Sequence, residues 1–164
     1  MAKKIVFHTD WFDIEEDKGH YTIVAPDAVC VFALTKEGKV IIVEQFRSSI
    51  KENTLEIPSG YIDSGETAER AASRELLEET GYVCKNLVLL GSMPVMSSRL
   101  TTKVYIFYGA EAVKKRGFVV KEKIKPHLFS FQELERMIVG GVFRYPLGIA
   151  AFTLARLKPV PFID

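Results

Sequence analysis

Cysteine is scarce in this sequence of 164 residues, which holds only Cys30 and Cys84. Both lie in apolar stretches, and no further cysteine or histidine stands near them at the spacing of a metal site. This pattern argues against a small secreted scaffold held together by disulfides. We therefore expect two buried free thiols in a protein of the reducing cytoplasm.

Long apolar runs and an excess of charge are also missing. No run approaches the roughly 18 apolar residues that span a bilayer. The N-terminus has two lysines but lacks the apolar core and cleavage site of a signal peptide. A net charge of +1 gives no electrostatic reason to bind nucleic acid or an anionic membrane. We expect neither as a partner.

The composition is that of an ordinary globular protein, with 48% hydrophobic and 26% charged residues. No repeat or low-complexity segment interrupts it. The length suits one domain with a sizeable core. We therefore predict a single domain over residues 1–164, in which residues 1–24 form an N-terminal β extension.

Short apolar segments rich in β-branched residues predict many strands. Near the N-terminus the acidic turn EEDKG separates two of them, and the turn TKEG joins two others into a hairpin. Pro126 places the last strand at a sheet edge, because proline cannot donate to a ladder. The predicted strands are KKIVFHTDWFDI, HYTIVA, AVCVFAL, KVIIVEQF, TLEIPSGYI, LVLLGSM, KVYIFYGA and IKPHLFS.

Three segments predict helices. Residues 66–80 are rich in helix formers and are followed by Gly81 at the position of a C-terminal cap. Ser130 and Glu133 form a capping box that begins a second helix, ending near Val139. The third helix is PLGIAAFTLARL, whose proline suits a first helical turn. Many strands with few helices indicate an α+β fold, an α/β/α sandwich with a mixed sheet.

The first helix crowds carboxylates onto one face. Glu75, Glu78 and Glu79 fall within an arc of about 100°, and like charges four residues apart destabilise a helix by roughly 0.2–0.5 kcal/mol per pair. One interpretation is a solvated acidic face. The other is a site for a divalent cation, because Mg²⁺ prefers oxygen ligands and phosphate. The residues alone leave both open.

The segment GYIDSGETAERAASRELLEETGY, residues 60–82, resembles a complete Nudix box, with every specified position filled. This resemblance implies a Nudix hydrolase with a loop–helix–loop that binds Mg²⁺, for which Mn²⁺ can substitute. It also implies hydrolysis of a nucleoside diphosphate linked to another moiety. Weaker resemblance over nearly the whole chain implies the Nudix fold.

The resemblance implies roles for individual residues. Arg74 pairs with a carboxylate of the box and fixes its orientation, although a surface ion pair with Glu78 is the plainer alternative. The implied catalytic residues are Glu78, Glu79, Glu122 and Arg74. The implied metal ligands are the Ser59 carbonyl, Glu75, Glu78, Glu79 and Glu122.

Two upstream segments, VEQFR and LEIPSGYID, resemble the branch that hydrolyses ADP-ribose and nucleoside-diphosphate sugars. The resemblance implies that Arg47 reaches the diphosphate and that Glu56 acts at the substrate or metal site. The alternative for Arg47 is a solvated strand end, and that for Glu122 is one charge on an exposed strand. Val120 stands where a catalytic glutamate is common, which leaves Glu122, Glu78 or a metal-bound hydroxide as the base.

The stretch MPVMSSRLTTKVYIF departs from the ADP-ribose pattern. No glycine follows Pro94, Thr102 stands near an expected acidic position, and Arg99 adds a cation. We therefore expect Arg99 to bind substrate and the activity to extend over nucleoside-diphosphate sugars. Trp11, Phe12 and Tyr21 could stack on a base or belong to the core; the sequence does not decide.

The branch is usually dimeric, and residues 1–24 are compatible with packing across a two-fold axis or with completing the sheet of one subunit. We expect a homodimer.

Two other functions stay open. One is a Nudix module that senses a nucleotide without cleaving it, which disagrees with a box that retains its glutamates. The other is a Nudix enzyme for nucleotide-pool cleansing, dinucleoside polyphosphates or coenzymes.

Overall fold

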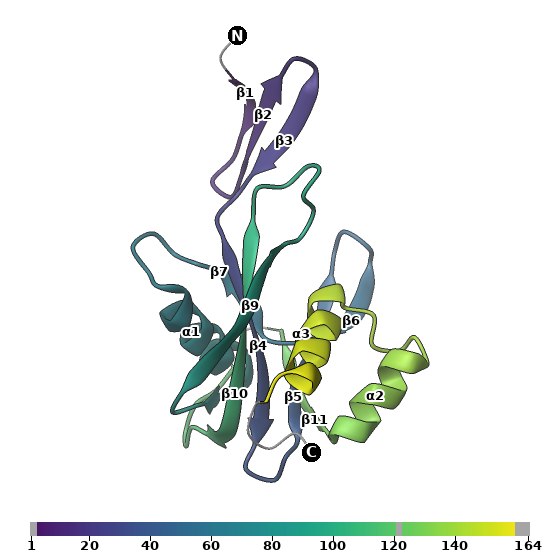
Figure 1. Ribbon diagram of the computed structural model, residues 1–164. Helices are drawn as coiled ribbons and strands as arrows, with labels where there is room; N and C mark the ends of the chain where they lie inside the picture. Colours follow the sequence, from purple (N-terminus) through teal and green to yellow (C-terminus); the bar gives the residue numbers. More distant parts are fainter. Residues whose placement is uncertain (1–2, 121–122, 160–164) are drawn as a thin grey trace.

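The computed structural model describes residues 3–120 and 123–159, which form two sheets and three helices. The larger, eight-stranded sheet is mixed, in the order β11-β5-β4-β10-β8, with β6 paired to β5, β7 to β4 and β9 to β10 (Figure 1). Its strands are β4 (Ala28–Thr35), β5 (Val40–Arg47), β6 (Glu52–Glu56), β7 (Ser59–Tyr61), β8 (Tyr82–Val83), β9 (Leu87–Pro94), β10 (Lys103–Lys114) and β11 (Lys125–Phe129).

Helices cover both faces of this sheet (Figure 1). Because strand residues alternate between faces, β4 contributes to two cores. Val29, Val31 and Ala33 pack with α1 (Ala68–Thr80). Cys30, Phe32 and Leu34 pack in the cluster that includes α2 (Phe131–Val139) and α3 (Pro146–Leu157). The predicted α/β/α sandwich is thereby confirmed.

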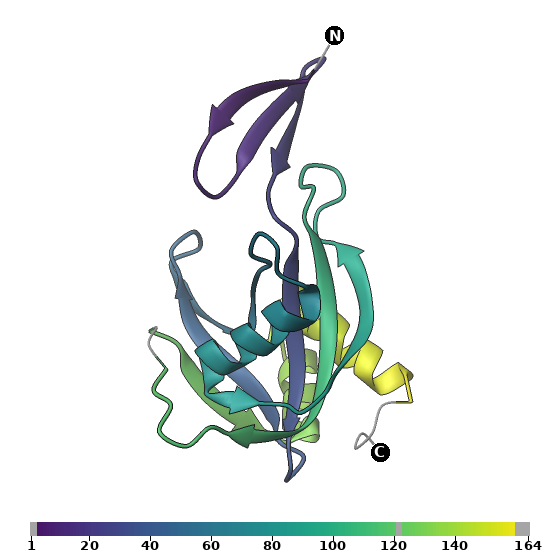
Figure 2. The same ribbon diagram turned by 90° about the vertical axis from the view of Figure 1, so that its left-hand side faces the viewer.

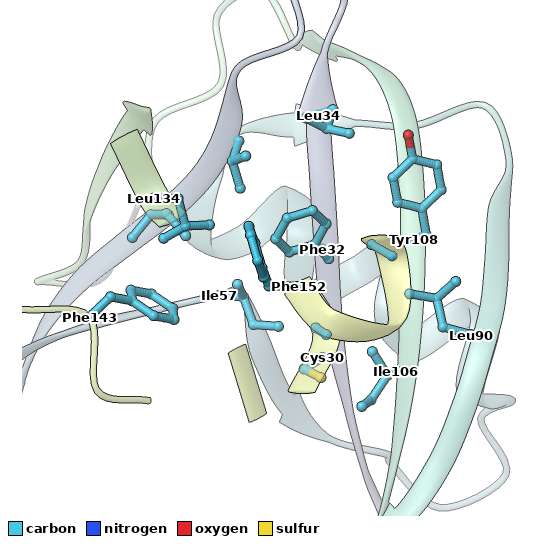
Figure 3. Close-up of a cluster of buried hydrophobic side chains, with 14 of the residues drawn as sticks. Cys30, Phe32, Leu34, Ile57, Leu90, Ile106, Tyr108, Leu134, Phe143 and Phe152 are labelled. Atoms are coloured by element: carbon cyan, nitrogen blue, oxygen red, sulfur yellow. The ribbon is translucent and has the colours of Figure 1, made fainter. Parts of the chain in front are cut away.

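The core on the side of α3 is built around aromatic contacts (Figure 3). Phe32 of β4 lies edge-on to Phe152 of α3, with ring centroids 6.3 Å apart. Burial raises the pKa of the Cys30 thiol to about 12. Cys30 is buried and Cys84 is half-buried, and both are free, so the expectation of two buried thiols is correct for Cys30 alone.

The helix boundaries follow local capping. The first helix begins two residues later than predicted, because the Thr67 side chain accepts a hydrogen bond from the Arg70 N–H and caps it. Gly81 ends it in the left-handed conformation, at φ 75°. The capping box of Ser130 and Glu133 and the proline at the start of α3 are both present as predicted.

One prediction for the strands was wrong in its bounds. The three acidic residues of EEDKG lie inside β2, and the chain turns at Lys18 and Gly19, both at positive φ. The predicted hairpin of β4 and β5 is present, with antiparallel pairing at Leu34 and Val40. It is short because β7 pairs with the start of β4, and β6 with the end of β5, on the edges that a longer hairpin would use. The prediction for Pro126 was correct, since β11 is an edge strand.

The N-terminal antiparallel sheet projects from the main body (Figures 1 and 2). It comprises β1 (Lys4–His8), β2 (Asp13–Asp17) and β3 (His20–Val24). The Ile23 N–H donates to the Arg99 carbonyl at 2.7 Å, and the Thr101 N–H donates to the Ile23 carbonyl at 3.0 Å. Trp11, Phe12 and Tyr21 are exposed rather than part of a core. In the described residues, no helix is long and apolar enough to cross a membrane.

Candidate active site

The helix α1 carries the crowded glutamates, and β7 lies directly against it. An added Cβ at Gly60 would lie 2.1 Å from Oε1 of Glu75, which is closer than side chains tolerate. Gly60 therefore allows the backbone of β7 to approach the Glu75 carboxylate. Gly65 is needed for a different reason, since its φ of 79° is strained for other residues.

Arg74 binds several carboxylates at once. It donates to both oxygens of Glu66, from Nε at 3.1 Å and from Nη2 at 2.9 Å, and to Glu75 from Nη1 at 2.5 Å. Nη2 also donates to the Tyr61 carbonyl at 2.9 Å. The ion pair with Glu78 is longer, at 3.5 Å, and more exposed. The hydrogen bond to Glu66 is the main cause that raises the pKa of Arg74. The pair with Glu78 is thus the weakest of these contacts.

Glu79 is buried, with 6% of its surface exposed. Its Oε2 accepts a hydrogen bond from the Ser59 N–H at 3.0 Å. The Ser59 hydroxyl in turn lies 3.5 Å from the hydroxyl of Tyr145. Burial raises the pKa of Tyr145, so its hydroxyl keeps its proton near neutral pH. These contacts join α1, β7 and the segment that precedes α3.

The donor atoms at this place suit Mg²⁺. The Glu75 and Glu79 carboxylates and the Ser59 backbone provide hard oxygen ligands, and all three groups lie around the close contact of β7 with α1. In the conformation described for residues 3–120 and 123–159, however, no three acidic, histidine or cysteine side chains form a metal-binding cluster. Arg74 and the Ser59 N–H engage carboxylate oxygens that a metal would use.

Arg47 lies beside a buried carboxylate. Glu56 is 2% exposed, and it accepts from Nε of Arg47 at 2.7 Å and from Nη2 at 2.5 Å. Thr54 and Gln45 also donate to Glu56. The hydrogen bond to Glu56 is the main cause that raises the pKa of Arg47. Arg47 and Glu56 line a cleft of about 860 Å³ together with Tyr145.

Other predicted residues lie apart from this cluster. The Arg99 guanidinium donates to the Tyr21 carbonyl at 3.0 Å, so it joins the β9–β10 loop to the N-terminal sheet. Thr102 is buried and donates to the Pro26 carbonyl. Glu122 lies outside the described residues, and the neighbouring Val120 is half-buried.

Tyr145 is the residue that sequence reasoning missed. It precedes Pro146 and occupies the N-cap position of α3 without a side-chain capping bond. Serine, threonine, aspartate and asparagine are preferred there. An aromatic residue at a predicted N-cap was therefore the available signal that this side chain has another role.

Similar proteins were found in three comparisons. The sequence profile of the NUDIX domain matches residues 24–141. The ADP-ribose pyrophosphatase of Bacillus subtilis is 41% identical over 86 residues, which are 52% of this chain and 46% of that protein. The methanol dehydrogenase activator of Bacillus methanolicus is 37% identical over 91 residues, which are 56% of this chain and 49% of that protein.

A solved structure described as an ADP compounds hydrolase has a TM-score of 0.77, with 18% identity, 95% of this chain covered and 90% of the other. That likeness supports the fold. The chain spans about half the length of the two curated relatives. Because the domain profile matches most of the chain, including the glutamate-bearing helix and the strands that hold it, this protein belongs to the NUDIX domain family.

Proposed function

We propose that this protein hydrolyses the pyrophosphate bond of nucleoside-diphosphate sugars or ADP-ribose, giving a nucleoside monophosphate and a sugar phosphate. The observation that carries the proposal is the contact of β7 with α1, where Ser59 and Gly60 meet Glu79 and Glu75 beside the Arg47–Glu56 pair. The likeness to an ADP-ribose pyrophosphatase supports the substrate class. The second relative is named for activating a dehydrogenase, so relatives' names alone do not fix the substrate.

The reaction uses Mg²⁺, with Mn²⁺ as a substitute, which neutralises charge on the phosphate oxygens when bound. Glu75 and Glu79 are its principal ligands, and the proposed set is completed by Ser59, Glu78 and Glu122. Arg74 positions this set, because it holds Glu66 and Glu75 from one guanidinium. Glu78 and Glu122 are the side chains proposed to accept the proton of the attacking water.

Arg47 is proposed to bind the diphosphate. Its guanidinium carries five N–H groups, and within the described part of the chain Glu56 accepts two of them. The side chain is 42% exposed at the cleft. Glu56 therefore fixes the direction of the guanidinium while donors stay accessible to phosphate oxygens.

We further propose that each chain folds as one domain and that two chains form a homodimer in the cytoplasm. Exposed apolar side chains on and beside the N-terminal sheet support the dimer, because isolated sheets seldom leave so many in water. These are Ile5, Val6, Phe7, Trp11 and Tyr21. The two free thiols support the reducing compartment.

A substrate panel with Mg²⁺ tests the function. Purified protein is incubated with ADP-ribose, ADP-glucose, UDP-glucose and ATP, and the products are identified by chromatography. We expect a nucleoside monophosphate from the first three. Release of pyrophosphate from ATP alone would indicate nucleotide-pool cleansing, and binding without hydrolysis would indicate a sensing module.

A further inference from the structure

One feature of the site that the sequence did not indicate is the cleft beside Arg47. It lies between the β5–β6 hairpin and residues 142–146, the segment that joins α2 to α3. Both walls are on the same side of the molecule (Figure 1). Arg144 of one wall donates to Glu52 of the other at 2.8 Å, so an ion pair links the two walls.

The cleft opens next to the groups proposed to bind the diphosphate. Tyr145 lines it, and the Tyr145 hydroxyl lies 3.5 Å from the Ser59 hydroxyl. The Ser59 N–H in turn donates to Glu79. Arg47 and Glu56 line the same cleft. A substrate whose diphosphate lies at Arg47 and α1 would therefore extend one of its two halves into this space.

The residues that line the cleft indicate which half of the substrate it binds. The four charged side chains among the described lining residues form two ion pairs, Arg47 with Glu56 and Arg144 with Glu52, so they add no net charge. The uncharged polar side chains of the described lining residues are hydroxyls and an amide, from Ser49, Thr54 and Asn53, and apolar side chains complete the walls: Ile50, Leu55, Val142 and Pro146. Among the described lining residues, Tyr145 supplies the one aromatic ring, and this residue is half-buried.

Hydroxyl and amide groups beside apolar side chains, in a cleft without net charge, suit a sugar, whose hydroxyls donate and accept hydrogen bonds while its C–H groups pack on the apolar walls. A nucleobase would call for exposed aromatic faces on which to stack. We propose that this cleft binds the sugar half of the substrate, which rests on the proposed function.

Val142 offers a way to fill the cleft without disturbing the core. It lines the cleft and is 61% exposed, so a tryptophan there reaches into the space from its rim. Val139 is the matched control, because it is 85% exposed at the end of α2 and is not among the lining residues. Val142→Trp and Val139→Trp add the same ring three residues apart.

The first measurement compares ADP-ribose with the β-methyl ester of ADP, which keeps the diphosphate and replaces the sugar by a methyl group. For Val142→Trp we expect KM for ADP-ribose to rise by roughly tenfold or more, and KM for the methyl ester to stay within about twofold. Val139→Trp should change neither. An equal rise for both substrates, or none for either, would overturn the proposal.

A second measurement does not depend on turnover. Ribose 5-phosphate and AMP, the two halves of ADP-ribose after hydrolysis, are titrated into each protein by calorimetry. Val142→Trp should abolish binding of ribose 5-phosphate and leave AMP binding unchanged. Loss of AMP binding instead would assign the cleft to the nucleoside. A wild-type protein that hydrolyses no diphosphate contradicts the proposed function, while these titrations still decide what the cleft binds.

Discussion

Gly60 and Glu75 are in direct contact across the junction of β7 and α1, since a Cβ at Gly60 would lie 2.1 Å from the Glu75 Oε1 atom. The backbone of Gly60 lies outside the left-handed region. Glycine is therefore required by the close approach and not by backbone conformation. The Glu75 carboxylate can occupy its position because Gly60 has no Cβ atom.

Gly60→Ala should displace the Glu75 carboxylate. We expect kcat to fall by about tenfold or more, because a misplaced charged group in the site weakens transition-state stabilisation. Steady-state kinetics with the preferred substrate of the panel measure the effect. Gly38→Ala is the control: it has φ 71° and no neighbour within 4 Å, so it should lower the melting temperature without changing kcat. An unchanged kcat in Gly60→Ala would contradict the role of this contact.

Glu79→Gln should lower kcat by about a hundredfold, because it removes a charge proposed to hold the metal. The fold should persist, since the amide oxygen can still accept the Ser59 N–H. Glu69→Gln, at an exposed position of the same helix, is the matched control and should keep wild-type kcat. Binding of Mn²⁺, followed by electron paramagnetic resonance, should weaken only in Glu79→Gln. Wild-type activity in that variant would refute the metal assignment.

Local sequence patterns predicted the framework of the site well. Glycine spacing, the capping box and the position of Pro126 are short-range signals, and each corresponds to a feature of the structure. The pairing of β4 with β10 was not predictable in this way, because the two strands are far apart in sequence and their contact is parallel. The TKEG turn is a local signal, and it correctly predicted the short antiparallel pairing of β4 with β5.

The cleft could not be predicted for the same reason. Tyr145 meets Ser59 across 86 residues of sequence, and no local pattern reports such a contact. Arg99 has a long-range contact of the same kind. Its guanidinium donates to a backbone carbonyl of β3, a partner that the sequence does not reveal, and its binding of substrate stays a prediction.

Arg74→Lys tests whether the guanidinium positions the carboxylates. Lysine cannot donate in parallel to both oxygens of Glu66 while reaching Glu75 and Tyr61. We expect a loss of roughly 1–3 kcal/mol in the free energy of unfolding, measured by urea titration. Arg70→Lys, at an exposed position of the same helix, should cause almost no change. Equal stability of the two variants would mean that charge alone is enough at position 74.

The pairing of Arg74 with Glu66 should also appear as a pH dependence of stability. The hydrogen bond from Arg74 is the main cause that lowers the pKa of Glu66. In the unfolded chain the carboxyl titrates near its ordinary pKa of about 4.3. The stabilisation is therefore complete above that pKa and is lost as pH falls through the lower pKa of the folded state.

We expect the melting temperature of the wild type to fall more steeply than that of Glu66→Gln as the pH decreases from about 5 to 3. The glutamine has no charge to lose, so its curve reports the other carboxylates only. Calorimetric scans at half-unit steps of pH measure the difference. Parallel curves for the two proteins would show that Arg74 does not lower the pKa of Glu66.

Two roles of Arg47 have to be separated, because it donates hydrogen bonds to Glu56 and is also proposed to bind the diphosphate of the substrate. Arg47→Ala leaves a carboxylate that is 2% exposed without its cationic partner. We expect a loss of roughly 1–3 kcal/mol in the free energy of unfolding from this change. A rise in KM in the single variant would therefore mix a disturbed cleft with a lost substrate contact. A second substitution is needed to separate them.

Arg47→Ala combined with Glu56→Gln removes the unpaired charge, and the glutamine can still bond with Thr54 and Gln45. The double variant should regain most of the stability lost in Arg47→Ala, as measured by urea titration. If Arg47 binds the diphosphate, KM stays raised by roughly tenfold or more in the double variant, because the guanidinium is still missing. Arg47→Lys should recover only part of this, since it lacks the planar fork. A KM that returns to the wild-type value together with stability would mean that Arg47 acts only by holding Glu56 in place.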